Sequence, residues 1–240
     1  MFKRVVIGLL GLLLSSACTA DEASLRKTIT EAYPKAEIKS IVKTNYSGLY
    51  EVFIGGQIIY TDDKFSFLIA EGHLVDPKNK RDITGERMEE LSKIDFSTLP
   101  LKDAVKVVKG NGSRTLVVFS DPDCPFCKRL EQNELVNVDN VTIYTFLYPL
   151  TELHPDSMNK AKAIWCDADQ GKAWTSWVLK GDLTKNDGKC DTPLEKNAML
   201  AAKVGVNSTP TMFFADGRRM TGAYPAKEIE AALDKATTKK

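Results

Sequence analysis

The chain has 240 residues, of which 43% are hydrophobic and 27% charged, as is usual for globular proteins, so the composition excludes a disordered, collagenous or polytopic membrane protein. Its 33 Lys and Arg residues balance 32 Asp and Glu residues without long runs of either sign, which excludes the electrostatic footprint of a protein that binds nucleic acid or an anionic membrane. The length suggests one large domain or two modest ones.

Residues 1–20 are typical of an export signal. Lys3 and Arg4 form a charged start, Val5–Leu14 is apolar, and small residues follow as far as Ala20. The apolar run is too short to cross a bilayer, which requires about 20 residues. We therefore expect an exported protein without stable membrane insertion, in preference to a retained anchor. One alternative stays open, because the residues before Cys18 loosely resemble a lipoprotein processing site.

Residues 21–80 predict a small α+β domain. Ser24–Tyr33 carries apolar residues at helical spacing, and Pro34 ends the helix. From Leu49 to Val75, short apolar segments alternate with turn residues, which indicates an antiparallel meander. The predicted strands are Leu49–Ile54, Gln57–Thr61, Phe65–Ala70 and His73–Val75.

Aromatic side chains are frequent in this meander and allow two interpretations. Aromatics that alternate along strands usually form the core of a sheet, but they can also line a substrate-binding surface. The residues concerned are Tyr46, Tyr50, Phe53, Tyr60, Phe65 and Phe67.

Residues 81–104 are predicted to link two domains. The polar segment Pro77–Arg81 leads into them, and Glu86–Leu91 has the pattern of a helix. With only Met88 and Leu91 to bury, this helix presents a mostly solvated face. We expect an interdomain helix.

Residues 105–240 predict an α/β domain with a helical insertion. Thr115–Phe119 is a continuous apolar strand, suited to the centre of a sheet that is covered on both sides. The other predicted strands are Val105–Val108, Val141–Leu147 and Thr211–Ala215, the last followed by a hairpin turn at Asp216-Gly217 and a further strand; the helices are Met158–Trp165, Ala173–Leu179, Thr192–Gly205 and Pro225–Ala236.

A Cys-Pro-Phe-Cys motif directly follows the central strand. Cys124 falls at the start of the next helix, where unpaired backbone N–H groups and the helix dipole favour a thiolate. Pro125 suits the first helical turn because it has no N–H to leave unpaired. Cys127 lies one turn further along the same edge, so the motif places a nucleophile beside its own resolving thiol. A zinc site is the alternative, but it needs a second such motif or a His pair, and the sequence has neither.

Four cysteines follow the export signal, and export makes disulfides the default for an even set. Four cysteines allow three pairings, and the gaps between them favour Cys124 with Cys127 and Cys166 with Cys190. The longer loop of the second pair is worth roughly 3–4 kcal/mol in the chain-entropy model, which predicts a structural disulfide. The first pair closes too small a loop for that gain, so we assign it to chemistry.

The motif and a later Thr209-Pro210 that enters a strand resemble the thioredoxin fold. More closely, Phe119-Ser120-Asp121, Ile164-Trp165-Cys166 and the N-terminal meander resemble the DsbC-type periplasmic disulfide isomerases over the whole mature chain. The resemblance implies a cis peptide at Pro210, a homodimer joined through residues 21–80, substrate held in a cleft, and electrons from a membrane reductase of the DsbD type.

This resemblance predicts a periplasmic thiol-disulfide oxidoreductase that isomerises or reduces mispaired disulfides of exported proteins without a cofactor or metal. Cys124 and Cys127 are the predicted catalytic residues, with substrate contacts at Thr209, Pro210, Pro125 and Phe126. The best-known isomerases carry Gly-Tyr where this chain has Pro125-Phe126. Pro in the first place also occurs in the oxidase DsbA and in the sister protein DsbG, so the preferred direction of exchange stays open and a dithiol oxidase is an alternative. A chaperone with incidental thiols is another. The two histidines, His73 and His154, are assigned ordinary surface or turn roles.

Overall fold

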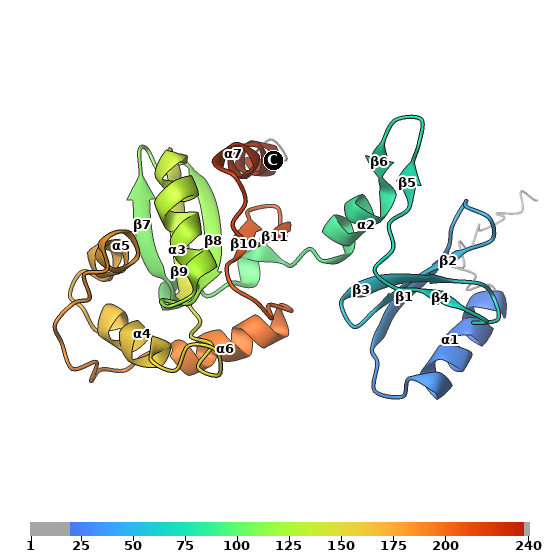
Figure 1. Ribbon diagram of the computed structural model, residues 1–240, viewed down its shortest axis with the longest axis horizontal. Helices are drawn as coiled ribbons and strands as arrows, with labels where there is room; N and C mark the ends of the chain where they lie inside the picture. The colour runs from blue at the N-terminus through green and yellow to red at the C-terminus, as the bar shows by residue number, and fades with distance from the viewer. Residues whose placement is uncertain (1–19, 238–240) are drawn as a thin grey trace, which may run out of the picture. The chain divides into compact units, whose positions relative to one another are not determined.

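The computed structural model describes residues 20–237 and divides into two compact units at Thr84 and Gly85, within the predicted linker region (Figure 1). The export signal predicted over residues 1–20 lies outside the described residues except for Ala20, and so does the question of Cys18. None of the helices between residues 20 and 237 has the length and hydropathy needed to cross a membrane.

The N-terminal unit packs one helix on an antiparallel sheet. Helix α1 (Ala20–Ala32) buries Leu25 and Ile29, which are four residues apart and therefore share one helical face. They meet Ile41, Tyr50 and Val52 from the sheet. The strands, in spatial order, are β1 (Ile38–Lys43), β2 (Tyr50–Ile54), β3 (Gln57–Thr61) and β4 (Leu68–Ile69).

Two features of this unit differ from the prediction. Strand β1 was not predicted, because lysines interrupt its apolar residues. The expected strand Phe65–Ala70 shrinks to the two residues of β4, since the Asp62 carboxylate accepts a hydrogen bond from the Ser66 N–H and Phe65 has a φ of 56°. This hydrogen bond and the positive φ of Phe65 make a turn where the apolar pattern indicated a strand.

The predicted linker region contains the expected helix, which begins earlier, at Ile83, and it is preceded by a hairpin that was not predicted. Strands β5 (Val75–Asp76) and β6 (Arg81–Asp82) form a hairpin and are followed by helix α2 (Ile83–Leu91). The side chains of Asp76 and Asn79 accept hydrogen bonds from backbone N–H groups two residues on, so polar residues build the turn.

The six aromatic residues of the meander divide between its two interpretations. Tyr50, Phe53 and Tyr60 are buried, which confirms the sheet-core interpretation for these three. Phe65 packs against the same core, whereas Tyr46 and Phe67 are exposed.

The C-terminal unit is a five-stranded mixed sheet with helices on both faces, which confirms the predicted α/β arrangement (Figure 1). Its spatial order is β11-β10-β8-β9-β7, and only the β8–β9 pair is parallel. The strands are β7 (Val105–Lys109), β8 (Arg114–Ser120), β9 (Val141–Leu147), β10 (Thr211–Phe214) and β11 (Arg219–Thr221). The helices are α3 (Pro125–Arg129), α4 (Ser157–Trp165), α5 (Gln170–Lys180), α6 (Leu194–Lys203) and α7 (Ala226–Thr237). The unit also has four short helical segments, which are η1 (Phe96–Thr98), η2 (Leu101–Asp103), η3 (Leu130–Glu134) and η4 (Leu135–Asn137).

Strand β8 occupies the centre because both of its faces are apolar. Leu116 and Val118 join the cluster under α7, whereas Val117 and Phe119 join the cluster under α6. Alternate residues of a strand point to opposite faces, so a continuous apolar run suits a sheet that is covered twice. The strand ends at Ser120, directly before the Cys-Pro-Phe-Cys motif.

Candidate active site

The motif forms the start of helix α3. Cys124 is the N-cap with extended backbone, and Pro125 is the first helical residue. The side chain of Cys127 is fully buried and Cys124 is 4% exposed, and their thiols are not bonded to each other. Pro125 and Phe126 are exposed, Phe126 to 58%, so the motif presents one large apolar side chain to solvent.

Hydrogen-bond donors around Cys124 favour its thiolate. The Cys127 thiol contributes most, the Thr209 side chain and the backbone N–H groups of Cys127 and Phe126 contribute less, and burial opposes them. Together they lower the pKa of Cys124 from 9.0 to about 5. Cys124 is therefore ionised at neutral pH, which is the state in which a thiol attacks a disulfide.

Cys127 has the opposite character. Burial raises the pKa of its thiol well above the ordinary value, and the hydrogen bond to Cys124 and the charge on Cys124 act in the same direction. The Ser120 hydroxyl and the Asp121 backbone N–H oppose this shift. Cys127 thus stays protonated at neutral pH.

The structure brings Thr209 and Pro210 against the motif. Their peptide bond is cis, and the Cys124 thiol donates to the Thr209 carbonyl over 3.5 Å. Pro210 is buried. The Thr209 hydroxyl oxygen is also buried, and among residues 20–237 it has no hydrogen-bond partner while Cys124 is a thiol. The same side chain helps to lower the pKa of Cys124, so its hydroxyl is available to a thiolate.

Cys166 and Cys190 are joined by a disulfide in the helical insertion. Cys166 is the C-cap of α4, and Cys190 lies in the segment before α6. Cys166 is half-buried and Cys190 exposed. The bond closes a segment with a sequence separation of 24 that includes the whole of α5.

Sequence reasoning missed the importance of Asp121 and its partner. The Asp121 side chain is fully buried and accepts hydrogen bonds from the backbone N–H groups of Asp123 at 2.7 Å and Leu150 at 2.6 Å. The Nδ1 atom of His154 lies 3.0 Å from the same carboxylate. His154 therefore has a turn role, as predicted, but one that borders the motif, whereas His73 pairs with Asp82 in the N-terminal unit.

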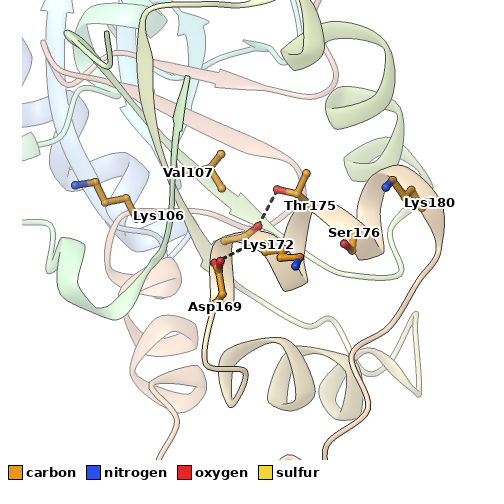
Figure 2. A pocket seen from close by; sticks show the side chains of 8 residues that line it. Lys106, Val107, Asp169, Lys172, Thr175, Ser176 and Lys180 are labelled. Carbon is orange, nitrogen blue, oxygen red and sulfur yellow. Dashed lines mark hydrogen bonds between the residues drawn. The ribbon is translucent and has the colours of Figure 1, made fainter. Parts of the chain in front are cut away.

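Two pockets of the C-terminal unit lie apart from the thiols. One, of 430 Å³, opens between β7 and α5 and is lined by Val107 and by polar residues that include Lys106, Asp169 and Lys172 (Figure 2). The dashed bonds in Figure 2 are internal to the first turns of α5. None of the predicted site residues lines this pocket.

The second pocket, of 160 Å³, contains a carboxyl group with a perturbed pKa. Burial raises the pKa of Glu131 to about 7, although the Trp174 indole donates to it at 3.1 Å and Lys109 lies close by. Within residues 20–237, no group of three or more His, Cys, Asp and Glu side chains is placed to hold a metal ion.

Comparison with known sequences gives two family matches that cover both units. Residues 101–237 match a thioredoxin-like domain, and residues 16–85 match a disulfide bond isomerase protein N-terminal domain.

Individual relatives agree with these matches. The chain is 41% identical over 210 residues to a probable thiol:disulfide interchange protein DsbC of Bordetella parapertussis, covering 88% of this chain and 73% of the relative. It is 25% identical over 223 residues to the DsbC protein of Escherichia coli K12, covering 92% and 90%. A crystal structure of a disulfide interchange protein from Neisseria gonorrhoeae, 43% identical, matches with a TM-score of 0.55 and covers 57% of this chain and 98% of that one.

Proposed function

Because the chain belongs to the DsbC family of thiol:disulfide interchange proteins, we propose that Cys124 and Cys127 are the residues with which it isomerises and reduces mispaired disulfides of exported proteins. The observation that carries this assignment is that the pKa values of two neighbouring thiols shift in opposite directions. The pKa of Cys124 falls to about 5, and the pKa of Cys127 rises. A strongly perturbed pair at a helix N-terminus is what thiol exchange requires.

The reaction begins with attack of the Cys124 thiolate on one sulfur of a substrate disulfide. A Cys124–substrate disulfide forms, the substrate S–S bond breaks, and the other substrate sulfur leaves as a thiolate. If a second substrate thiolate attacks the mixed disulfide, Cys124 is released and the substrate has been isomerised. If Cys127 attacks instead, the substrate leaves reduced and Cys124 and Cys127 become oxidised.

The low pKa of Cys124 makes its attack on the substrate disulfide fast. The raised pKa of Cys127 makes attack by Cys127 depend on the state of Cys124. Burial is the main cause of the raised pKa of Cys127, and the charge on Cys124 adds to it; once Cys124 is bound to substrate it carries no charge, so this added repulsion disappears. Cys127 then becomes easier to ionise and can attack. The enzyme thereby gains an exit from mixed disulfides that do not isomerise.

Substrate contacts are assigned to the residues around the sulfur. An extended substrate segment would pair with the backbone next to Pro210, as strands pair at a sheet edge. The carbonyl of Thr209 already lies 3.5 Å from the Cys124 sulfur, which supports this register. Phe126, 58% exposed, offers an apolar contact for partly folded clients.

The location and partners follow from the family and from the sequence. Residues 1–20 would direct export to the periplasm, and a membrane reductase of the DsbD type would return electrons to the oxidised Cys124–Cys127 pair. Cell fractionation tests the location, and accumulation of the oxidised pair in cells that lack such a reductase tests the partner.

The N-terminal unit is assigned to homodimer formation. Strand β4 lies at the edge of its sheet, and Phe67, Leu68 and Ile69 are consecutive apolar residues, each at least 40% exposed. An apolar edge strand of this kind is unprotected against pairing with another chain. A Leu68→Asp variant should be monomeric by light scattering, while the wild type should have twice the monomer mass.

A dithiol oxidase is the second candidate. The low pKa of Cys124 stabilises the reduced form and so makes its disulfide more oxidising, and Pro125 occupies a place where oxidases also have proline. Rapid acid quenching of cells, followed by alkylation, separates the two activities. An isomerase is found largely reduced, whereas a largely oxidised pair would contradict our assignment.

A further inference from the structure

The turn Asp121–Asp123 connects β8 to Cys124. Residues that lie between β9 and α6 form hydrogen bonds with each of its three residues. Asp121 has the contacts to Leu150 and His154 described above. The Cys124 N–H also bonds to the Asp121 carbonyl over 3.2 Å. The position of the nucleophile therefore depends on what holds this turn.

The Pro122 carbonyl is held by a tryptophan of helix α5. The indole Nε1–H of Trp177 donates to it over 2.7 Å, at the short end of the range for such bonds. Trp177 is half-buried, and this bond joins residues 55 positions apart in the chain. It links α5 directly to the turn that precedes the nucleophile.

Asp123 is held by a lysine of helix α4. Both of its carboxylate oxygens accept hydrogen bonds from the Lys160 ammonium group, at 2.8 and 2.6 Å. The two side chains are only 18% and 16% exposed, so water screens this pair less than an exposed surface pair.

Trp177 also contacts the helix on the far side of the motif. The ammonium groups of Lys128 and Lys160 lie over its ring, 4.6 and 5.2 Å from the centroid, which is close enough for cation–π attraction. Lys128 directly follows Cys127 in α3. One indole side chain thus bonds to the turn before Cys124 and packs on the residue after Cys127.

We propose that Trp177 and Asp123 are positioning residues for Cys124, which fix the turn and α3 against the helical insertion so that the sulfur stays aligned with its hydrogen-bond donors. This inference rests on the proposed function of Cys124 as the nucleophile. It adds a role for the insertion, which holds the reactive sulfur in place although it supplies no reacting atom.

The mechanism of this effect is geometric. The donors to the Cys124 sulfur include the Cys127 thiol and backbone N–H groups within the same turn of helix. Such bonds weaken steeply as their angle departs from linearity. If the turn loses its bond to Trp177 or Lys160, the sulfur moves relative to these donors, its thiolate is less stabilised and attack on a disulfide slows.

Replacing Asp123 separates an effect of position from an effect of charge, because the two change the pKa of Cys124 in opposite directions. An Asp123→Asn change removes a negative charge beside Cys124, so through charge alone the thiolate would become more stable and its pKa would fall. Through position the pKa would rise, because an amide does not hold the Lys160 ammonium with both of its polar atoms.

The first test replaces the indole and leaves an aromatic ring. Trp177→Phe keeps a surface for Lys128 and Lys160 but removes the donor to Pro122. Trp165→Phe is the matched control, since Trp165 makes the same kind of bond, to the Asp191 carbonyl, within the same insertion. The measurement is the pH dependence of Cys124 alkylation in the full chain, followed at Cys124 by fragmentation mass spectrometry, with Cys127 retained in all proteins because its thiol is the largest donor to the Cys124 sulfur.

We expect Trp177→Phe to raise the pKa of Cys124 and to slow its reaction with a small disulfide at neutral pH by about three- to tenfold, the equivalent of one hydrogen bond. Trp165→Phe should match its parent in both measurements. Equal values for Trp177→Phe and Trp165→Phe would overturn the role of Trp177.

The second test uses Asp123→Asn, which does not depend on an aromatic replacement that could disturb packing. A rise in the pKa of Cys124 supports positioning, whereas an unchanged or lowered pKa overturns it for Asp123. Urea unfolding of each variant shows whether the fold is intact. The proposed function fails in a different way, if the wild type neither alkylates quickly at Cys124 nor reduces a disulfide.

Discussion

The C-terminal unit contains two pairs of cysteines, which differ in burial, in bonding and in their position relative to the helices. Cys124 and Cys127 are buried, unbonded and lie at the start of a helix, while Cys166 and Cys190 are more exposed and bonded, Cys166 at the end of α4 and Cys190 in the segment before α6. Exposure alone would rank the second pair as the more reactive. The ranking is reversed because the first pair has donors that stabilise a thiolate.

This difference shows that the surroundings of a sulfur decide its role. At Cys124 the thiol of Cys127 and backbone N–H groups lower the pKa, so the reduced form is stabilised and the pair can exchange. At Cys166 the bond joins the end of α4 to the segment before α6, which restrains the insertion that holds the active-site turn. We therefore propose that the first pair reacts and that the second supports the structure around it.

The strongest test of the difference between the two pairs is to replace one cysteine at a time. Cys124→Ser should abolish turnover of a scrambled disulfide protein, because no other described thiol has a lowered pKa. Cys127→Ser should accumulate mixed disulfides on non-reducing gels, since attack survives while one exit is lost. Cys166→Ser should still reduce a small disulfide reagent. Equal residual activity in the Cys124 and Cys127 variants would contradict the assigned roles.

The features of the candidate site that the sequence predicts are those whose pattern is local. The apolar run of β8, Pro125 at the first helical position and the spacing of the cysteines are all readable within a few residues. The thioredoxin-like fold and the family also followed from such motifs and are confirmed by the comparisons.

The rest of the site depends on contacts between distant residues. His154, Lys160 and Trp177 reach the turn from 33, 37 and 55 positions away, and no periodicity links them to it. In the N-terminal unit, the positive φ of Phe65 likewise overrides a strand pattern because a side chain makes the turn.

A second prediction concerns stability and the pair Cys166–Cys190. Replacing both cysteines by Ser should lower the free energy of unfolding by roughly 3–4 kcal/mol, as the loop-closure relation gives for this loop length. Urea unfolding of the oxidised proteins measures the change. A single Cys166→Ser variant should lose about as much as the double variant, because each breaks the same bond. Two additive losses would mean that the side chains act through packing.

A third prediction uses pH to compare the reduced pair with its serine variant. In the unfolded chain Cys124 keeps a pKa near 9.0, but in the fold it is about 5, so between these values the unfolded state binds more protons. Stability from this group is therefore complete above about pH 9 and is lost as the pH falls toward about 5. At pH 7, two units above the folded pKa of about 5, it amounts to about 3 kcal/mol.

The measurement is the difference in unfolding free energy between the reduced wild type and Cys124→Ser as a function of pH. The difference should grow from pH 5 to pH 8, because only the wild type carries this titrating thiol. Parallel curves for the two proteins would show that the pKa of Cys124 is not lowered in the fold.

The smallest expected effect, and the finest test of how donors make a cysteine reactive, is at Thr209. Its hydroxyl has no partner within the described chain while Cys124 is a thiol, and the Cys124 S–H donates to the carbonyl of the same residue. Ionisation removes that S–H bond and leaves a charged acceptor beside an unused donor. Thr209→Val keeps the shape and removes the donor. The pKa of Cys124 should rise by about one unit, the equivalent of about 1.5 kcal/mol for a hydrogen bond to a charged group, and the potential of the Cys124–Cys127 pair should become more reducing by about 30 mV. Thr211→Val is the control, because the hydroxyl of Thr211 is already engaged by the Ser208 carbonyl at 2.8 Å. Titration of thiolate absorbance and equilibration with glutathione give both quantities, and if the Thr209 variant keeps the wild-type pKa and potential, then Thr209 acts only through its contact with substrate and the other donors account for the whole shift.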